Sequence, residues 1–288
     1  MQGQLSSAGA MSAADLPGNT RSRSEALVTG WAELWRGGWV IFTKHMRKFM
    51  GNSMEIGGTL GWPILWVVTF GLGMESIVDT GALGGVGSYL AFITPGIIAL
   101  TALSGAVNAG MVLLEEKMKG VLKEYFVAPI PRMSILLANS GSGLVKTMLQ
   151  VAIILLLAVV LGAQITGGFW GLWGAAIFLL LYVSAFVGFS NGMAARSKSV
   201  GGYHMLLFVL NLPLLFLSNA LYPLATMPAW MRFFAYLNPT TYFVDGLRHT
   251  LYRSGELPIW LDLVMLVAFV MLCGWFGLRS FRKLLEGV

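Results

Sequence analysis

The sequence predicts an all-α integral membrane fold with six transmembrane helices. Hydrophobic residues make up 56% of the 288 residues and charged residues only 11%, whereas charged residues are about a quarter of a soluble domain. The mean hydropathy is +0.73. The apolar residues form continuous runs of helix length rather than the alternating segments of about ten residues that build a membrane β-barrel.

Six apolar runs are long enough to cross a bilayer. A hydrocarbon core of about 30 Å requires about 20 residues of helix. The runs cover about residues 56–77, 89–114, 143–161, 168–194, 201–221 and 257–278. We therefore assign residues 51–288 to one six-span transmembrane domain.

The distribution of Lys and Arg predicts the orientation of these spans. Of the 19 Lys and Arg residues, 15 lie in the segments on one side of the predicted membrane. Only Arg232, Arg248 and Arg253 lie on the other side, and Lys146 lies inside the third run. Because cytoplasmic loops carry the excess of positive charge, we expect a multi-pass protein of the plasma (inner) membrane with both termini cytoplasmic. Contact with anionic membrane lipids accounts for the net charge of +6, so we expect no nucleic-acid partner.

The first 50 residues divide into two parts. Residues 1–26 are small and polar and are expected to form a disordered cytoplasmic tail. Residues 27–50 are predicted to form an amphipathic interfacial helix; the alternative is a plain juxtamembrane anchor. Its apolar arc contains Trp31, Leu34, Trp35, Trp39, Phe42, Met46 and Phe49, and its polar arc contains Glu33, Arg36, Lys44 and Arg47.

A short charged helix is predicted between the second and third spans, over residues 115–128. Its apolar arc contains Met118, Val121, Leu122, Tyr125 and Phe126, and its polar side contains Glu116, Lys119, Lys123 and Glu124. Pro129 and Pro131 end the helix, because proline cannot continue the hydrogen-bond ladder. The pattern is typical of a helix that docks in a groove of a partner, and a helix lying on the membrane surface is the alternative.

Residues 223–252, between the fifth and sixth spans, are predicted to form short helices that dip back from the outer surface. Pro223 and Pro228 interrupt the chain, and Asn238 followed by Pro239 is a helix-start signal. Asp245 and Arg248 are three residues apart and therefore lie on one face of this helix. The aromatic residues expected at the outer interface are Trp230, Phe233, Phe234, Tyr236, Tyr242 and Phe243. A cap that only holds the bundle together is the alternative.

Polar residues within two spans are candidates for a substrate path. Thr101, Ser104 and Asn108 recur along the second span, and Asn211 and Ser218 share a face of the fifth, beside Asn219. Hydrogen bonding between helices is the alternative for both stripes.

Two segments carry a resemblance to a known family, the permeases of ABC-2 type exporters. The spacing of Glu116, Gly120, Leu122, Pro129 and Arg132 resembles the segment that follows the second span in that family. Residues 217–248 are similar to its segment between spans five and six, including "MP.W" and "NP.TY..D..R". The resemblance covers the chain from about Leu27 onward, and Lys123 departs from the Glu that the family often has there.

The resemblance implies a subunit that pairs with a second copy of itself and with two cytoplasmic ATP-binding cassette subunits. ATP and Mg²⁺ would belong to those partners, and this chain would hold no cofactor. The residues implied to couple the chain to the ATPases are Glu115, Glu116, Met118, Lys119, Gly120, Val121, Leu122, Lys123, Glu124, Tyr125, Phe126, Pro129 and Arg132. The re-entrant segment with Pro223, Pro228, Trp230, Asn238, Pro239, Asp245 and Arg248 would roof the exit, and the polar stripes would line a cavity between protomers.

The function predicted on this basis is export of a lipophilic or amphiphilic substrate, a drug or a lipid, driven by a separate ATPase. Export of a polysaccharide or lipid-linked glycan is the first alternative, and a non-ABC channel or membrane enzyme is the second. The segment "NSGSGLVKT" is not a phosphate-binding loop, because Ser140 and Val145 stand where that loop needs glycines. His45, His204 and His249 are scattered, so we predict no metal site and no catalytic residue.

Overall fold

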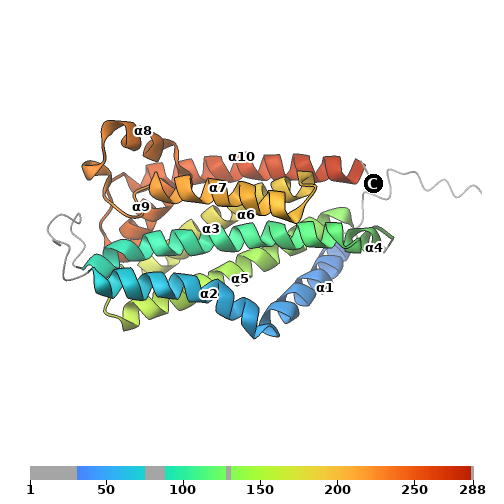
Figure 1. Cartoon of the computed structure of the whole chain (residues 1–288), viewed down its shortest axis with the longest axis horizontal. Helices are drawn as coiled ribbons and strands as arrows, with labels where there is room; N and C mark the ends of the chain where they lie inside the picture. The colour runs from blue at the N-terminus through green and yellow to red at the C-terminus, as the bar shows by residue number, and fades with distance from the viewer. Residues whose placement is uncertain (1–30, 75–87, 128–130, 287–288) are drawn as a thin grey trace, which may run out of the picture.

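The computed structural model describes residues 31–74, 88–127 and 131–286, and the regular elements within these ranges are helices (Figure 1). The predicted tail at residues 1–26 lies outside them. The helices are α1 (Trp31–Met50), α2 (Ser53–Trp66), the π-helical η2 (Val67–Leu72), α3 (Tyr89–Met118), α4 (Val121–Val127), α5 (Arg132–Val160), α6 (Gly168–Arg196), α7 (Val200–Phe216), the 3₁₀ turn η4 (Leu224–Thr226), α8 (Ala229–Leu237), α9 (Pro239–Tyr252) and α10 (Ile259–Glu286).

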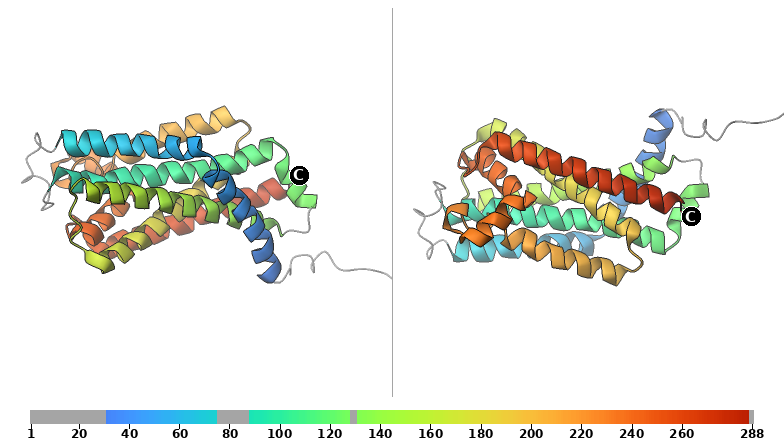
Figure 2. Two further views of the ribbon diagram at one scale, coloured as in Figure 1. Left: turned by 90° about the horizontal axis from the view of Figure 1, so that it is seen from below. Right: turned by 90° about the horizontal axis from the view of Figure 1, so that it is seen from above.

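The long helices run along one axis and form an elongated bundle (Figures 1 and 2). The short helices α8 and α9 gather at one end, which we call the α9 end, and α4 lies at the other, which we call the α4 end. Helix α6 packs against α3 and α10, and α3 also packs along α5. Residues of α3 are buried from its first turn to its last, so α3 is the centre of the bundle.

Four helices in the described part of the chain are long and apolar enough to cross a membrane. They are α3, α5 from Met133, α6, and α10 from Ile259 to Leu284, and they confirm the predicted second, third, fourth and sixth runs as apolar helices. The first run corresponds to α2 and η2, which follow one another without a break over residues 53–72. The fifth corresponds to α7, an apolar helix of 17 residues.

Two predicted boundaries are wrong. Helix α5 begins at Arg132, not near residue 143, because polar side chains in its first turns are satisfied by neighbouring helices. The side-chain amide of Asn139, for example, donates to the carbonyl of Ala109 at 2.9 Å. Helix α7 ends at Phe216, not near residue 221, so Ser218 does not continue a helical stripe from Asn211.

Glycines let the helices around α3 approach closely. A Cβ atom at Gly105 would lie 2.2 Å from the hydroxyl of Thr147 on α5, and one at Gly110 would lie 2.1 Å from the hydroxyl of Ser190 on α6. The amide of Gly110 donates to that Ser190 hydroxyl at 3.1 Å. Small residues at such contacts are the usual means of packing helices in a membrane, where the hydrophobic effect does not hold helices together.

Candidate functional site: a charged cluster at the α4 end

Helix α1 crosses α5 at the α4 end and buries one face there (Figure 2). Ile41, His45 and Phe49 are almost fully buried on this face. Trp35 and Trp39 of the predicted apolar arc are instead 71% and 63% exposed. Exposed tryptophans suit contact with lipid headgroups, so the interfacial role of α1 stays a prediction that this geometry permits.

The single helix predicted over residues 115–128 is wrong. Helix α3 continues through Met118, so Glu115, Glu116 and Met118 belong to its last turns and Lys119 is its C-cap. Gly120 then turns the chain with φ +79°, in the left-handed region that other residues rarely adopt. The separate helix is α4, over Val121–Val127.

Helix α4 is partly seated on the bundle itself. Leu122 is buried and packs in a cluster with Ile41 of α1 and Leu114 of α3, while Val121 and Tyr125 are half-buried. Three side chains of the predicted docking set face outward at this end: Met118 is 54% exposed, and Lys119 and Glu124 are also exposed. The side chains of Lys123, Phe126 and Arg132, and the whole of Pro129, lie outside the described residues.

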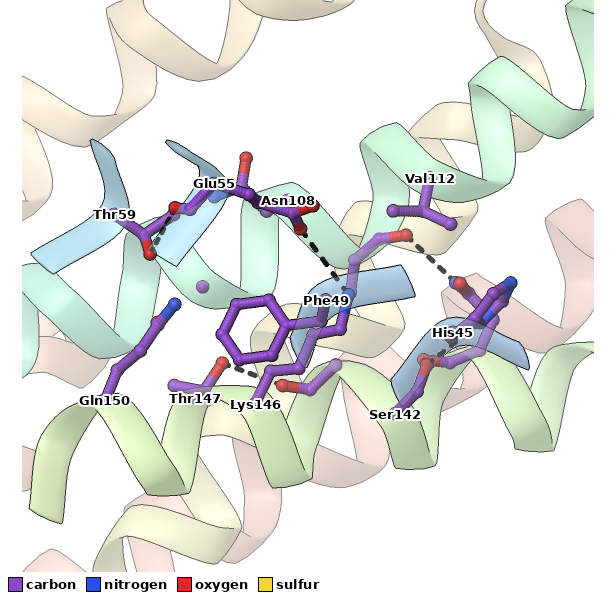
Figure 3. A pocket seen from close by; sticks show the side chains of 14 residues that line it. His45, Phe49, Glu55, Thr59, Asn108, Val112, Ser142, Lys146, Thr147 and Gln150 are labelled. Atoms are coloured by element: carbon purple, nitrogen blue, oxygen red, sulfur yellow. Dashed lines mark hydrogen bonds and ion pairs between the residues drawn. The ribbon is translucent and has the colours of Figure 1, made fainter. Parts of the chain in front are cut away.

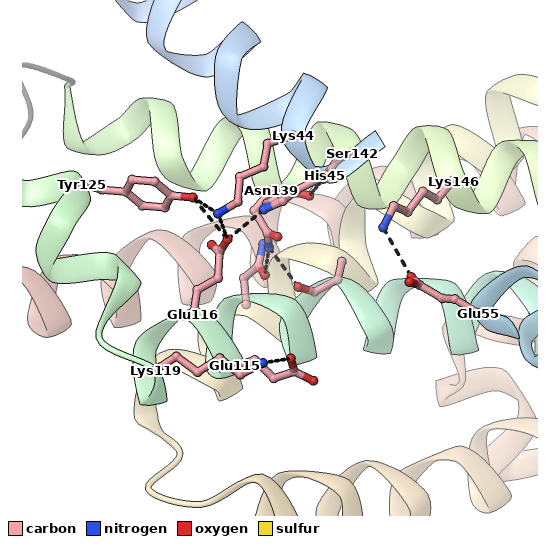
Figure 4. A network of polar contacts seen from close by, with 12 residues as sticks. Lys44, His45, Glu55, Glu115, Glu116, Lys119, Tyr125, Asn139, Ser142 and Lys146 are labelled. Carbon is pink, nitrogen blue, oxygen red and sulfur yellow. Dashed lines mark hydrogen bonds and ion pairs between the residues drawn. The ribbon is translucent and has the colours of Figure 1, made fainter. Parts of the chain in front are cut away.

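Glu116 is the centre of a polar cluster that joins α1, α3 and α4 (Figure 4). Its Oε1 accepts hydrogen bonds from Lys44 Nζ at 3.1 Å, from His45 Nε2 at 3.1 Å and from the Tyr125 hydroxyl at 3.2 Å. Lys44 Nζ also donates to the Tyr125 hydroxyl at 2.6 Å. Glu116, predicted on the polar side of the docking helix, is only 8% exposed, because it lies in the last turns of α3 and is covered by its partners on α1 and α4.

The electrostatics of the cluster hold α4 in place. Burial lowers the pKa of Lys44, but its hydrogen bonds to Tyr125 and Glu116 outweigh that effect and raise the pKa above its ordinary value. Burial raises the pKa of Tyr125, so its hydroxyl keeps its proton and can donate to Glu116. Hydrogen bonds in which one partner is charged are about twice as strong as neutral ones. The cluster, Lys44, His45, Glu116 and Tyr125, therefore ties α4 to both α1 and α3.

Two cavities continue from this cluster toward the middle of the bundle. One of about 140 Å³ has a charged lining that comprises Lys44, Lys48, Glu55, Glu115, Glu116, Lys119 and Lys146. The other, of about 30 Å³, extends from His45 to Gln150 and is shown in Figure 3. Lys146 lines both cavities; it lies 3.6 Å from Glu55 of α2 and over the ring of Phe49 at 4.8 Å. Since α5 begins at Arg132, Lys146 lies well inside the helix and not in its first turns.

The structure divides the predicted path residues into buried and accessible sets. Thr101 is buried and donates to the carbonyl of Ile97 in its own helix at 2.8 Å. Ser218 and Asn219 are fully buried. Ser104 and Asn108 are exposed on α3, where Asn108 lines the smaller cavity, and Asn211 is half-exposed on α7. Their part in a substrate path stays a prediction.

The segment between α7 and α10 forms short helices, as predicted, with Pro223 and Pro228 just before η4 and α8. The Asn238 side chain accepts from the amide of Thr240 at 2.9 Å, and Pro239 opens α9. Asn238 also donates to the carbonyls of Leu214 and Leu217, so it fastens α9 to the end of α7. Four of the six predicted interface aromatics are exposed: Trp230, Phe233, Phe234 and Tyr236. The other two, Tyr242 and Phe243, are buried, because α9 packs inside the bundle against α6.

Asp245 and Arg248 of this segment connect neighbouring elements inside the bundle. Both are buried. The carboxylate of Asp245 accepts from the amides of Glu256 and Leu257, each at 2.9 Å. Arg248 donates to the carbonyl of Asn219 at 2.8 Å, and its guanidinium lies 4.0 Å from the Phe92 ring centroid. The pair therefore connects α9 to α3, to the end of α7 and to the loop before α10.

The cluster and the charged cavity were missed in the sequence because their members are far apart along the chain. His45 and Glu116 are separated by 71 positions, so no local pattern connects them. One signal was present: Glu55 and Lys146 are single charges in apolar segments, and such charges usually have a partner.

An apolar helical bundle with a charged cluster at one end defines an integral membrane protein, and comparison with known proteins gives its class. A family model described as ABC-2 type transporter matches residues 37–252. The putative transport permease ycf38 of Cyanophora paradoxa is 32% identical over 241 residues, 78% of this chain and 81% of that protein. The inner membrane transport permease YadH of Escherichia coli K12 is 23% identical over 240 residues, 81% of this chain and 91% of that one.

A third relative is named for resistance to a drug. The daunorubicin resistance ABC transporter permease protein DrrB1 of Streptomyces coeruleorubidus is 26% identical over 170 residues, 58% of this chain and 59% of that protein. The chain is thus a membrane transport permease, and it belongs to the ABC-2 type transporter family.

Proposed function

We propose that this chain is the transmembrane subunit of an exporter in which separate cytoplasmic subunits hydrolyse ATP. The observation that carries the proposal is the tie between α4 and the long helix α3, made by Tyr125, Glu116 and Lys44. The family match supports it, since the relatives are named transport permeases and one is named for drug resistance. On this proposal ATP and Mg²⁺ belong to two ATP-binding cassette subunits, and the chain itself is not an enzyme.

In the proposed topology α2 with η2 and α7 are spans one and five, in addition to the four long apolar helices. An even number of spans puts both termini on one side. The α4 end is the cytoplasmic side, because it carries the Lys and Arg excess and the end of α10 lies there with α4 in Figure 1. The α9 end then faces outward.

Force would enter through α4 and pass to the bundle. An ATPase subunit that grips the exposed side of α4 and the nearby Met118 would move α4 as it closes around ATP. Because Tyr125 and Leu122 fix α4 to α3 and α1, those helices would move with it. Coupling of this kind requires that the bundle has two conformations and that the ATPase favours a different one before and after it closes. The contact between α4 and α3 would transmit the movement of α4 to the bundle.

The substrate we propose is amphiphilic and enters near the charged cavity at the α4 end. Lysines and carboxylates in that cavity can hold a polar head, and the exposed apolar side chains of the spans can hold a hydrophobic tail. Ser104 and Asn108 are exposed on α3, farther from the α4 end than the charged cavity. They would extend the substrate path between this chain and a second copy of it.

The test is reconstitution of the full chain in lipid vesicles with and without its ATP-binding cassette partner. We expect the two proteins to copurify, and we expect a daunorubicin-like drug or a labelled lipid to stimulate ATP hydrolysis and to be transported only when both are present. Transport by the chain alone, or stimulation by a polysaccharide and by no amphiphile, would contradict the proposal.

A further inference from the structure

A second group of titratable side chains lies at the α9 end, away from the cluster at the α4 end. Asp245 and His249 are on successive turns of α9, and Asp262 is in the first turn of α10. One ligand atom from each residue lies within 4.8 Å of the others. One bound ion can bridge such separations after a small adjustment of the side chains.

Asp262 is the residue that points to a ligand. It is 0% exposed, and neither of its carboxylate oxygens has a hydrogen-bond partner within the described part of the chain. A buried charge without a partner is costly, and two neighbouring buried carboxylates repel one another. Asp245 beside it is equally buried. The pair must share a proton or a cation.

The distance between His249 and Asp245 favours a cation. His249 Nε2 and Asp245 Oδ2 are 3.7 Å apart, which is too long for a hydrogen bond. Two atoms that each bind one zinc ion at about 2.1 Å, with a bond angle near 110–125°, lie about 3.4–3.7 Å apart. The imidazole adds a nitrogen donor that a shared proton between two carboxylates would not need.

The surroundings hold two of the three ligands in place and leave a way in. The amides of Glu256 and Leu257 fix the carboxylate of Asp245, as outer hydrogen bonds do for metal ligands in general. A Cβ atom at Gly255 would lie 2.0 Å from His249 Nε2, so the ring can take this position only beside a glycine. The His249 side chain is 26% exposed, so an ion can enter past it.

We propose that Asp245, His249 and Asp262 bind one divalent transition-metal ion, for which Zn²⁺ is the best chemical match. Zn²⁺ accepts a mixture of imidazole nitrogen and carboxylate oxygen, whereas Mg²⁺ and Ca²⁺ prefer oxygen ligands alone. His249 Nε2 now contacts the carbonyl of Leu257 at 2.5 Å, and binding replaces that contact with the ion. The ion would fasten the last turns of α9 to the start of α10. This goes beyond the proposed transport function and does not depend on it.

The test uses the untagged full chain in lipid nanodiscs, stripped of metal with a chelator. We expect calorimetric titration with Zn²⁺ to show one site per chain, and titration with Mg²⁺ to show none. X-ray absorption should find nitrogen and oxygen ligands at about 2.0–2.1 Å. Asp262→Asn and His249→Gln should each weaken Zn²⁺ binding at least about tenfold, since loss of even an outer partner of a metal ligand costs 10–100-fold.

Two further variants complete the test. Gly255→Ala should weaken binding in the same way by displacing the His249 ring. His204→Gln, which removes an exposed histidine on α7, is the matched control and should bind Zn²⁺ as the unaltered chain does. Absence of stoichiometric binding, or binding that survives both Asp262→Asn and His249→Gln, would overturn the proposal. If Asp262→Asn does not fold, the partly exposed His249→Gln decides alone.

Discussion

The hydroxyl of Tyr125 on α4 donates to the carboxylate of Glu116 on α3 at 3.2 Å, although a turn at Gly120 separates the two helices. Lys44 of α1 donates to both groups. One short helix is thus attached to two others by hydrogen bonds that involve a charged partner, at the end of the bundle where an ATPase subunit is proposed to bind.

Tyr125→Phe should weaken coupling without unfolding the bundle. The change removes only the hydroxyl that joins Lys44 and Glu116, and it keeps the aromatic ring that packs beside them. We expect substrate transport per ATP hydrolysed to fall several-fold, while the melting temperature changes by no more than a few degrees. The measurement is transport and ATP hydrolysis in the same vesicles.

Tyr236→Phe is the control for this prediction. Tyr236 is 42% exposed on α8, at the opposite end of the bundle, and the change removes the same hydroxyl group. We expect its transport per ATP to equal that of the unaltered chain. Equal ratios for Tyr125→Phe and Tyr236→Phe would show that the Tyr125 hydroxyl has no part in coupling.

Gly120→Ala should destabilise the chain through its backbone alone. The residue has φ +79°, and a left-handed conformation costs about 1–2 kcal/mol for a residue with a Cβ atom. No atom lies within 4 Å of that Cβ, so no side-chain clash contributes. Gly58→Ala is the matched change, since Gly58 is in the middle of α2 with an equally open Cβ position, and it should stabilise by about 0.5–1 kcal/mol. Reversible unfolding in mixed micelles gives both values, and the same sign for both would contradict the argument.

The sequence predicted those features that depend only on residues close together along the chain. The apolar runs predicted the helices that can cross a membrane, and the Asn238–Pro239 pair predicted the start of α9, whose cap the structure contains. The outward or inward direction of aromatic residues was predicted less well. Tyr242 and Phe243 are buried because α9 packs against α6, a contact between distant segments that no local pattern records.

The candidate site depended on such distant contacts almost entirely. A glycine with positive φ cannot be told from a glycine inside a helix by its neighbours in sequence, so the turn at Gly120 was missed and α3 and α4 were predicted as one helix. The early start of α5 was missed because Asn139 finds its partners on α3 and α6 rather than in solvent. Hydropathy measures the polarity of a residue and not whether a neighbouring helix satisfies it.

The cluster at the α4 end should lose part of its stabilising effect at high pH. Lys44 has a pKa raised above its ordinary value of 10.5, so its contribution is fully present below that value and is lost as pH rises through the folded pKa. Tyr125 has a pKa raised above 10.0, so the folded chain resists its ionisation while the unfolded chain does not, and stability again falls above that value.

We therefore expect the melting temperature to fall more steeply between about pH 10 and 11.5 in the unaltered chain than in the double variant Lys44→Met, Tyr125→Phe. Between about pH 7 and 9 the difference between the two proteins should be constant, because neither group changes its charge in the folded or the unfolded chain there. A difference that varies between pH 7 and 9 would mean that another group dominates the cluster.

The ion pair between Lys146 and Glu55 should show an asymmetric response to removal of either partner. The atoms are 3.6 Å apart, and the side chain of Lys146 is 15% exposed whereas that of Glu55 is 31% exposed. Glu55→Gln leaves the less exposed charge without its partner, so it should destabilise by about 1–3 kcal/mol, below the cost of breaking a fully buried pair. Lys146→Met leaves the more exposed charge and adds apolar packing over Phe49, so it should cost less. The double variant should be more stable than Glu55→Gln alone, since no charge then remains unpaired. Unfolding measurements on the four proteins test this, and additive single effects would mean that the two charges do not interact.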